Sequence, residues 1–306
     1  MPSVALPAER PSPNGYLVGL VGSGIGPSLS PPLHEREARA LGLDYRYRRL
    51  DLDLLGVAPG AIGDLLAAAH AAGYHGLNIT HPCKQLVMPH LDELSPDAAA
   101  IGAVNTVVLA GGRSVGHNTD WSGFRHGLED GLPGVGLGRV VLLGAGGAGA
   151  AAAHALLTVG VGRLTVLDVD AARADRLAGN LAARFGTGRA VAGDAGRDLD
   201  RHVAGADGLV HATPTGMAAH PGLPLAPDLL RPQMWVADIV YRPLDTALLQ
   251  AARGRGCRTL DGGRMAVHQA VDAFRLFTGA QPDAHRMLGH FAELVATAEE
   301  DDRAHV

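Results

Sequence analysis

A glycine-rich loop between a predicted strand and a predicted helix constrains the fold of this 306-residue chain more than any other feature. Residues 144–149 read Gly-Ala-Gly-Gly-Ala-Gly, so the spacing G-x-G-x-x-G is formed by Gly144, Gly146 and Gly149. Glycines at this spacing let the backbone approach a pyrophosphate at a helix N-terminus, whose N–H groups and dipole favour negative charge. The pattern predicts a Rossmann-type dinucleotide-binding domain, with tight packing of strand against helix as the alternative explanation of the glycines.

An acidic residue at the end of the next predicted strand indicates which dinucleotide binds. Asp168 follows the run 163–167, about 20 residues beyond the loop, as expected for the acid that contacts a ribose. Its carboxylate can accept a hydrogen bond from a ribose 2′-hydroxyl and would repel a 2′-phosphate, which favours NAD over NADP. Asp168 could instead cap the following helix, but Asp170 lies closer to that helix and fits the cap better. Arg173 is the competing signal, because an arginine at this place can pair with a phosphate.

Strand-like and helix-like segments alternate along most of the chain. The predicted strands are 16–21, 45–50, 75–79, 105–109, 139–143, 163–167, 208–210 and 235–240. Helical stretches separate most of them, including 31–41 and 61–72 in the first series. This alternation predicts an α/β fold with mainly parallel sheets that are covered by helices on both faces.

The alternation forms two series, which predicts two lobes. We expect residues 1–117 plus 262–306 to form an α/β substrate-binding and catalytic domain, and residues 118–261 to form a doubly wound, NAD-binding Rossmann domain. The C-terminal helical stretches, 262–277 and 284–297, are predicted to pack back on the first lobe through one apolar face. Ser30, which two prolines follow, is predicted to be the N-cap of the first helix.

Composition and charge exclude several classes of protein. With a net charge of −5 and no long basic run, the chain has no signature of nucleic-acid binding. Cys83 and Cys257 lack CxxC spacing and the 15 histidines lack HExxH spacing, so neither a disulfide framework nor a metal site is expected. The run 144–162 contains six glycines and a histidine, which argues against a membrane span. Because the N-terminus lacks the features of a signal peptide, we expect a cytoplasmic protein whose partner is a small-molecule substrate.

Lys84 is the only lysine, whereas the chain contains 25 arginines. A guanidinium keeps its proton in proteins, but a lysine ammonium can lose and regain one, so this lysine indicates proton transfer, with an accident of composition as the alternative. Asp120 is the candidate partner of Lys84, although an aspartate there also fits the N-cap of the next helix. Hydride transfer from an alcohol to a nicotinamide leaves a hydroxyl proton, which a positioned acid–base group can accept.

Several short segments are specific when they are taken together and in order. They are Ser28-Leu29-Ser30-Pro31; Asn78-Ile79-Thr80 with Pro82 and Lys84; Gly102-Ala103-Val104-Asn105-Thr106; Gly116 with Asn118-Thr119-Asp120; the glycine loop; Ala212-Thr213-Pro214 with Gly216-Met217; and Asp261-Gly262 with Gln269. In these segments, and over nearly its whole length, the chain resembles the shikimate/quinate dehydrogenase family.

The resemblance implies roles for several of these positions, and it adds contacts to the cofactor residues inferred above. Lys84 and Asp120 are expected to be the catalytic pair. The expected substrate contacts are Ser28 and Ser30 for a carboxylate, and Thr80, Asn105 and Gln269 for ring hydroxyls. The expected cofactor contacts are Gly144, Gly146, Gly147, Ala148, Asp168, Arg173, Thr213, Ile239 and Gly262. Hydroxyl and amide groups both donate and accept hydrogen bonds, so these residue types suit a polyhydroxylated cyclic acid.

Some of these positions have simpler explanations, and some depart from the family pattern. Thr80 could merely end a strand, and Gln269 could be a boundary residue on a helix. NADP-using biosynthetic members usually carry an Asn-Arg-Thr type of segment where this chain has Asp-Val-Asp at 168–170, so the chain resembles the NAD-using quinate/shikimate branch. Ser30 stands where quinate-preferring relatives often have threonine, and His211 stands where the family commonly has asparagine.

The resemblance implies an NAD-dependent oxidoreductase that interconverts shikimate and 3-dehydroshikimate, and quinate and 3-dehydroquinate, in aromatic amino acid biosynthesis or quinate metabolism. An aminoshikimate-type dehydrogenase of a secondary pathway is one alternative, because the two substrates differ by an amine in place of a hydroxyl. A catalytically silent NAD-binding regulatory protein is another, which the intact Lys84 and Asp120 disfavour. The oligomeric state is left open, with a homodimer as one candidate.

Overall fold

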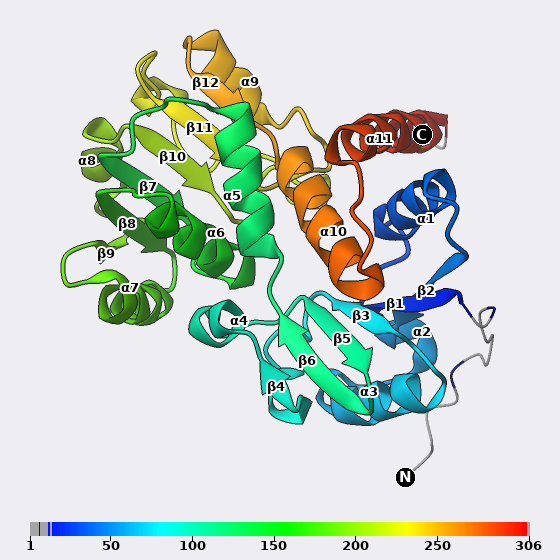
Figure 1. The fold of residues 1–306 in the computed structure, drawn as a ribbon. Coiled ribbons are helices and arrows are strands. Elements are labelled where there is room, and N and C mark those ends of the chain that lie inside the picture. Colours follow the sequence, from blue (N-terminus) through cyan, green and yellow to red (C-terminus); the bar gives the residue numbers. More distant parts are fainter. Residues whose placement is uncertain (1–5, 7–11, 13, 305–306) are drawn as a thin grey trace. The chain divides into compact units, whose positions relative to one another are not determined.

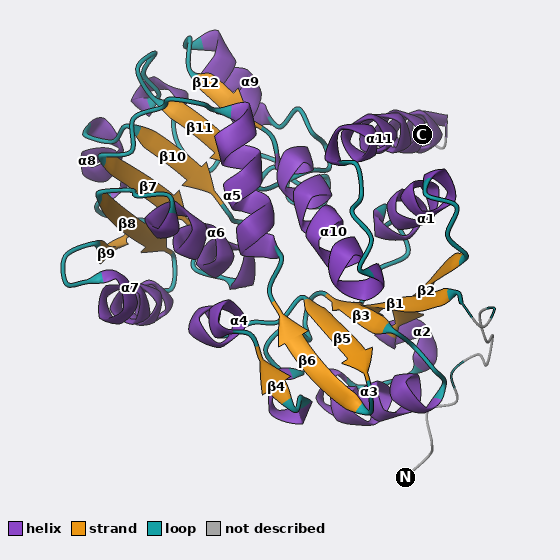
Figure 2. Cartoon of the chain, viewed as in Figure 1, coloured by secondary structure: helices purple, strands orange, loops and turns teal. Residues whose placement is uncertain are grey.

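The computed structural model describes residues 6, 12 and 14–304, and the chain divides into two units (Figure 1). Unit 1 comprises Met1–Thr119 and Ala270–Val306, and unit 2 comprises Asp120–Gln269. Each unit contains one sheet with helices packed on it (Figure 2). The predicted α/β fold with two lobes is confirmed, and so is the return of the C-terminal helices to the first lobe, although it begins at Ala270 and not at Gly262.

The sheet of unit 1 has the strand order β2-β1-β3-β5-β6-β4. Its strands are β1 (Tyr16–Gly22), β2 (Tyr45–Asp51), β3 (Gly76–Ile79), β4 (Glu93–Leu94), β5 (Thr106–Ala110) and β6 (Arg113–His117). β1 pairs in parallel with β2 and β3, as predicted, but β5 is antiparallel to both β3 and β6. Gly111 and Gly112 both have positive φ, which allows the tight hairpin turn between β5 and β6.

Helices cover both faces of this sheet. They are α1 (Ser30–Ala40), α2 (Leu52–Leu55), α3 (Ile62–Ala71), α4 (Pro96–Ile101), α11 (Ala284–Ala304) and the part of α10 (Gly262–Thr278) from Ala270 onward. Neighbouring residues of β1 point to opposite faces, so Leu17 packs in the cluster that contains α3, and Val18 packs in the cluster that contains Phe274 and Phe277 of α10. The apolar face of α10 therefore forms part of the core of unit 1.

An ion pair between α1 and α11 also attaches the C-terminal segment to unit 1. The Glu37 side chain is fully buried, and its carboxylate accepts hydrogen bonds from Arg286 Nε at 2.9 Å and Nη2 at 2.6 Å. The Asp283 N–H donates to the same carboxylate at 2.8 Å. Because removing one partner would leave a buried charge uncompensated, this contact fixes where α11 lies on α1.

His34 of α1 is buried in an aromatic cluster of unit 1. Its ring lies within 6.4 Å, centroid to centroid, of Tyr45, Tyr47, Phe274 and Phe277. His34 Nδ1 is 3.1 Å from the Tyr45 hydroxyl, and Nε2 has no hydrogen-bond partner among the described residues. Burial lowers the pKa of His34 from 6.5 to about 3, because the surroundings do not solvate an imidazolium.

We expect this buried histidine to make the protein less stable in acid. The pKa of His34 is about 3 in the folded protein, below the ordinary histidine value of 6.5. Between these two values the unfolded chain binds the proton and the folded protein does not, so stability falls as the pH falls through that window. Between about pH 7 and pH 5 this one group should lower the unfolding free energy by about 2 kcal/mol. Urea unfolding at both pH values measures the loss in the wild type and in His34→Gln, which cannot titrate.

The control for this measurement is His70→Gln, which removes an exposed histidine of α3 and should leave the pH dependence unchanged. The variant His34→Gln keeps a polar partner for Tyr45, so that its loss of packing affects both pH values alike. An equal pH dependence in wild type and His34→Gln would contradict a neutral, buried His34.

The sheet of unit 2 is entirely parallel and has the strand order β12-β11-β10-β7-β8-β9. Its strands are β7 (Arg139–Leu143), β8 (Arg163–Asp168), β9 (Ala190–Asp194), β10 (Gly208–His211), β11 (Trp235–Asp238) and β12 (Arg258–Leu260). Counted from β7, this is the order 6-5-4-1-2-3 of the doubly wound dinucleotide-binding fold, whose ligands bind at the carboxyl ends of the strands where the order reverses. That point lies between β7 and β10.

Helices cover both faces of the second sheet as well. They are α5 (Asp120–Gly131), α6 (Gly147–Thr158), α7 (Ala171–Phe185), α8 (Leu199–Ala204) and α9 (Ala247–Gly254). Val140 and Leu142 pack in the cluster with α5, α6 and α7, and Val141 and Leu143 pack in the cluster with α8 and α9. Both faces of β7 are thus apolar, which is why a short, continuous hydrophobic run predicted it correctly.

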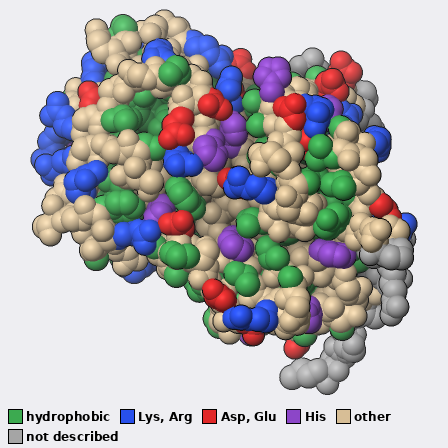
Figure 3. Space-filling model, viewed as in Figure 1, with side chains coloured by type: hydrophobic (Ala, Val, Ile, Leu, Met, Phe, Trp, Pro, Cys, Tyr) green, Lys and Arg blue, Asp and Glu red, His purple; other side chains and the backbone are tan. Residues whose placement is uncertain are grey.

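Among the described residues, no helix is long and apolar enough to cross a bilayer. On the face drawn in Figure 3, arginine side chains gather at the edge of unit 2 near α8. Two exposed arginines of this region are close to acidic side chains, Arg197 to Asp194 at 3.7 Å and Arg201 to Asp198 at 3.3 Å. Acidic groups therefore offset part of this positive charge.

Candidate active site

The glycine loop follows β7, at the point where the strand order of unit 2 reverses. Two of its glycines are required by the fold itself. Gly144 has φ +101°, and a Cβ there would lie 2.6 Å from the carbonyl oxygen of Ala212. A Cβ on Gly149 would lie 2.0 Å from the carbonyl oxygen of Gly144, so α6 can approach the loop only with glycine at this place.

The glycines between them have no such requirement. A Cβ on Gly146 or Gly147 would meet nothing within 4 Å, and Gly146 has an ordinary extended backbone, with φ −76°. Gly146 is also the N-cap of α6, with no side-chain cap. Internal packing therefore explains Gly144 and Gly149 but not Gly146, and the open space beside it leaves room for a phosphate at the helix N-terminus.

Asp168 is the last residue of β8, and its carboxylate faces the glycine loop. Oδ2 accepts a hydrogen bond from the Ala145 N–H at 2.7 Å, and Oδ1 accepts one from the Asp170 N–H at 2.9 Å. Asp170 is the N-cap of α7 and accepts from the Arg173 N–H, so the prediction that Asp170 rather than Asp168 caps this helix is confirmed. The Arg173 Nε lies 3.7 Å from the Asp170 carboxylate, which gives this guanidinium an acidic neighbour.

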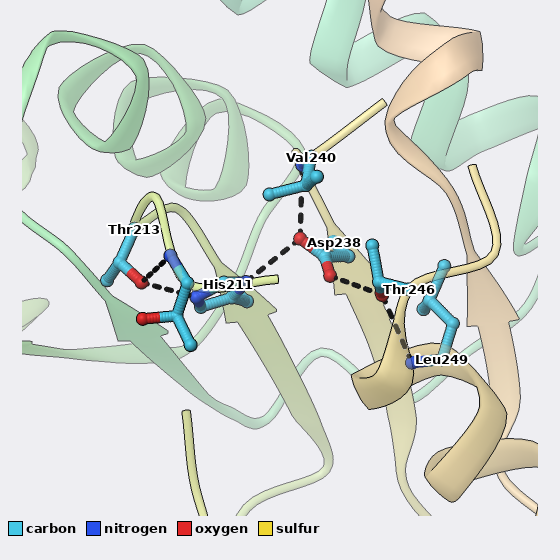
Figure 4. A network of polar contacts seen from close by, with 7 residues as sticks. His211, Thr213, Asp238, Val240, Thr246 and Leu249 are labelled. Carbon is cyan, nitrogen blue, oxygen red and sulfur yellow. Dashed lines mark hydrogen bonds and ion pairs between the residues drawn. The ribbon is translucent and has the colours of Figure 1, made fainter. Parts of the chain in front are cut away.

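Thr213 follows β10, on the other side of the reversal point. Its hydroxyl lies 2.5 Å from Nε2 of His211, whose Nδ1 lies 2.9 Å from Asp238 at the end of β11 (Figure 4). The sequence did not predict this network, because His211 and Asp238 lie on different strands. The only signal was polar residues, His211 and Asp238, closing two strands that are otherwise apolar.

Ile239 and Gly262 are in contact through their backbones. The Ile239 N–H donates to the His211 carbonyl at 2.9 Å, which extends the pairing of β10 and β11 by one residue. A Cβ on Gly262 would lie 2.2 Å from the Ile239 carbonyl oxygen. Close packing therefore accounts for the glycine at position 262, whether or not a cofactor touches it.

Lys84 lies in unit 1, in the turn segment that follows β3. Thr80 comes directly after β3, and its carbonyl accepts from the Cys83 N–H at 2.8 Å, while the Lys84 carbonyl accepts from the Val104 N–H at 2.8 Å. The Lys84 side chain is half-buried. Cys83 is fully buried in the apolar core, and burial raises the pKa of its thiol, so it is a packed cysteine rather than an activated nucleophile.

Asn105 holds the residue that precedes Asp120. Asn105 Oδ1 accepts from the Thr119 N–H at 2.7 Å, and Asn105 Nδ2 donates to the Thr119 hydroxyl at 2.9 Å. Asp120 is buried and is the first residue of α5. The side chain of Asn105 thus fixes the backbone at the point where unit 1 ends and α5 begins.

Asn105 belongs to a buried polar network across the first sheet. The Tyr47 hydroxyl donates to Asn78 Oδ1 at 2.7 Å, and Asn78 Nδ2 donates to the Thr106 hydroxyl at 3.1 Å. The Thr106 hydroxyl in turn donates to Asn105 Oδ1 at 3.1 Å. Sequence reasoning assigned no role to Tyr47, Asn78 or Thr106, although Asn78 stood out as an amide within the apolar run of β3.

The Ser28–Ser30 segment lies between β1 and α1. Ser30 was predicted to be the N-cap, and this prediction is wrong: Leu29 is the N-cap, and Ser30 is the first residue of α1. The Ser30 N–H donates to the Ser28 hydroxyl at 3.3 Å, and both side chains are half-exposed. The Ser30 hydroxyl is therefore not used to cap the helix.

Two residues of β2 hold this serine segment, and neither was predicted. The Asp51 carboxylate accepts from the Ile25 N–H at 2.9 Å, and Arg49 Nη2 donates to the Ser28 carbonyl at 2.8 Å. The Ser23 N–H donates to the His81 carbonyl at 3.0 Å, which joins the segment to the turn that carries Lys84. The loops that follow β1 and β3 thus join the two serines to the turn with Thr80 and Lys84. Asn105 directly precedes β5, and its carbonyl accepts from the Ile79 N–H at the end of β3.

Gln269 lies on α10, at the end of unit 2. It is half-buried, and its Nε2 donates to the Ala266 carbonyl of the same helix at 2.9 Å. A Cβ on Gly123 of α5 would lie 2.6 Å from the Gln269 backbone nitrogen, so α5 and α10 are in backbone contact here. In the part of the chain that the structure describes, no group of three or more His, Cys, Asp or Glu side chains could hold a metal ion.

Comparisons with known proteins agree with this architecture. The family model of the shikimate dehydrogenase substrate binding domain matches residues 20–107, and that of the shikimate 5′-dehydrogenase C-terminal domain matches residues 263–289. The shikimate dehydrogenase (NADP(+)) of Streptomyces avermitilis is 62% identical over 285 residues, which cover 93% of this chain and 98% of that protein. The quinate/shikimate dehydrogenase (NAD(+)) of Corynebacterium efficiens is 51% identical over 282 residues, which cover 92% and 99%.

A solved structure gives the same result. The quinate dehydrogenase from Corynebacterium glutamicum in complex with NAD superposes with a TM-score of 0.87 at 49% identity, covering 91% of this chain and 99% of that one. The resemblance that the sequence motifs suggested is confirmed. This chain belongs to the shikimate dehydrogenase family.

Proposed function

We propose that this protein is an NAD-dependent dehydrogenase that interconverts shikimate and 3-dehydroshikimate, and quinate and 3-dehydroquinate. One observation carries the proposal: over more than nine tenths of its length the chain is 62% identical to a shikimate dehydrogenase and 51% identical to a quinate/shikimate dehydrogenase. Such a match includes both the turn with Lys84 and the glycine loop. In this proposal unit 1 binds the substrate and unit 2 binds the dinucleotide.

Lys84 and Asp120 are the proposed acid–base pair. A bound nicotinamide ring would supply the hydride acceptor. As hydride leaves the carbinol carbon, the Lys84 amine takes the hydroxyl proton, and in the reverse direction the ammonium returns that proton to the carbonyl oxygen. Asp120 would orient the amine. The structure supports these roles because the backbone at both residues is held by hydrogen bonds. The Lys84 carbonyl accepts from the Val104 N–H, and the N–H of Thr119, which precedes Asp120, donates to Asn105.

The loops of unit 1 supply most of the proposed substrate contacts, and Gln269 of α10 supplies one more. Ser28 and Ser30 would hold the carboxylate, and the Arg49 guanidinium on the Ser28 carbonyl adds positive charge beside it. Thr80, Asn105 and Gln269 would contact ring hydroxyls. A site built from such groups rejects an analogue that lacks a hydroxyl, because its own polar atoms are then left unpaired.

Initial rates of NADH formation with shikimate, quinate and the amino analogue of shikimate test the proposed substrates. We expect turnover of shikimate and of quinate. Turnover of the amino analogue alone would favour an aminoshikimate-type dehydrogenase. Binding of the dinucleotide without turnover of any of the three would favour a regulatory protein.

The proposed cofactor is NAD, and Asp168 is the reason. Its carboxylate ends β8 beside the glycine loop, where negative charge would repel a 2′-phosphate. The only arginine proposed for this site, Arg173, has the Asp170 carboxylate as a neighbour. The names of the relatives do not decide the cofactor, because the Streptomyces protein is named for NADP(+) and the Corynebacterium protein for NAD(+).

We expect kcat/KM to be at least about tenfold higher with NAD than with NADP. The variant Asp168→Asn keeps an acceptor for the Ala145 N–H but loses the charge, so the preference should shrink by about tenfold, mainly through a lower KM for NADP. Asp175→Asn removes an exposed charge of α7 and is the matched control, with an unchanged ratio. A wild-type preference for NADP would refute the cofactor assignment.

A further inference from the structure

A chain of side-chain hydrogen bonds joins Thr213 to the ends of two strands in unit 2 (Figure 4). His211 and Asp238 are the last residues of β10 and β11, and they are direct neighbours in the strand pairing. Both side chains are fully buried, and Nδ1 of His211 lies 2.9 Å from Asp238 Oδ1. The acid–base chemistry proposed for Lys84 does not use either residue.

The donors and acceptors around Asp238 fix the orientation of the imidazole. Asp238 Oδ1 also accepts from the Val240 N–H at 3.0 Å, and Oδ2 accepts from the Thr246 hydroxyl at 2.7 Å. A carboxylate only accepts, so Nδ1 of His211 must be the donor in their contact. The ring therefore cannot flip without losing a hydrogen bond in a buried site.

The other nitrogen of this fixed ring contacts Thr213. His211 Nε2 lies 2.5 Å from the Thr213 hydroxyl, which also accepts from the Thr215 N–H at 3.3 Å. The tautomer with its proton on Nδ1 leaves Nε2 as the acceptor. The Thr213 hydroxyl then donates to Nε2, one of its oxygen lone pairs accepts from the Thr215 N–H, and the second lone pair remains for a donor group of a ligand. A single orientation of the Thr213 hydroxyl is thus set by residues outside the loop that carries it.

We propose that His211 is a positioning residue for the dinucleotide: held by Asp238, it fixes the Thr213 hydroxyl as an acceptor for a hydrogen-bond donor of the bound cofactor. The inference rests on the proposed function and on the expectation, implied by the family resemblance, that Thr213 contacts the cofactor. It also accounts for a histidine at position 211, for which the sequence offered no reason. Asp238 also has a structural role, because it accepts a hydrogen bond from the Thr246 hydroxyl, which caps α9.

Two substitutions separate the two contacts of the imidazole. His211→Asn places an amide near the position of Nδ1, so it can still donate to Asp238 but does not reach Thr213. His211→Gln places its amide near the position of Nε2, so it can still contact Thr213 but loses Asp238. Thr213→Val removes the hydroxyl itself. Its rise in Kd is therefore the upper limit for any effect of His211 that acts through this hydroxyl.

The measurement is the Kd of NAD and of NADP without substrate, by titration calorimetry, together with kcat, KM and Tm. We expect His211→Asn to raise the Kd of the preferred dinucleotide about fivefold to tenfold, approaching Thr213→Val, with kcat within about twofold of wild type. His211→Gln should bind more tightly than His211→Asn, although it loses the contact with Asp238. Thr246→Val, which damages the same network on the far side of Asp238, should lower Tm and leave the Kd unchanged.

An unchanged Kd in His211→Asn would overturn the proposal, and so would an equal rise of Kd in Thr246→Val, because general loosening would then explain both. These results do not depend on turnover. A wild-type protein that binds NAD but oxidises neither shikimate nor quinate would refute the proposed function and leave the role of His211 intact.

Discussion

Lys84→Met is expected to lower kcat for shikimate oxidation by about 100- to 10,000-fold, the range that a positioned acid–base group contributes. Methionine has about the length of the lysine stem and no group that can carry a proton. The Lys84 side chain is half-buried, and its backbone is held by Val104, so the substitution should leave the fold intact. The Kd of NAD should not change, because the glycine loop belongs to unit 2.

The matched control is Lys84→Arg, which keeps the positive charge and the long side chain. A guanidinium does not release its proton in proteins, so the arginine variant should be almost as inactive as the methionine variant. If the position supplied only a charge for substrate binding, Lys84→Arg would instead recover most of the activity and show its defect mainly in KM. Turnover by Lys84→Met at the wild-type rate would refute the proposed chemistry.

The sequence predicted those features of the fold that depend on local patterns. The hydrophobic run of β7, the glycine spacing and Asp168 lie within one βαβ segment, so their arrangement follows from neighbouring residues. The return of α10 and α11 to unit 1 was also predictable, because the apolar face of α10 needed a partner and both faces of β1 were apolar.

Features that depend on contacts between distant segments were missed. Serine is a common N-cap residue, so Ser30 was expected to precede α1. A turn in which the Ser28 N–H donates to the Ile25 carbonyl comes just before the helix, and α1 begins one residue earlier than predicted, with Leu29 as the N-cap. The antiparallel β5 was not foreseen, because strand direction depends on pairing with β3 and not on local sequence. The same reason hid the contact of His211 with Asp238 and those of Asn78 with Tyr47 and Thr106, because these partners lie 27 or more residues away.

The candidate site was predicted as a set of residues, and the structure adds how the fold holds them. Asn105 was singled out for substrate binding, yet its amide also fixes Thr119 beside Asp120. Gly262 was singled out for the cofactor, yet the approach of the Ile239 carbonyl already requires a glycine there. Where both packing and ligand binding explain a residue, substituting it does not separate the two explanations. The sharpest experiments therefore use positions where packing does not require the residue that is present.

The glycine loop offers such a comparison, and Gly149→Ala and Gly146→Ala are expected to fail in different ways. A Cβ at position 149 would lie 2.0 Å from a backbone oxygen, so α6 must move, and the unfolding free energy should fall by about 3 kcal/mol. At position 146 a Cβ meets nothing within 4 Å, and the backbone conformation suits alanine, so stability should change by less than about 1 kcal/mol.

NAD binding should be affected directly by Gly146→Ala, the variant that keeps its stability. The methyl group of Gly146→Ala would occupy the space through which a pyrophosphate reaches the N-terminus of α6, so the Kd of NAD should rise by at least about tenfold in a protein that is still fully folded. Urea unfolding and calorimetric titration of both variants measure the two quantities separately. Tight NAD binding by Gly146→Ala would mean that the open space beside Gly146 is not the phosphate site, and the dinucleotide would then have to approach the sheet elsewhere.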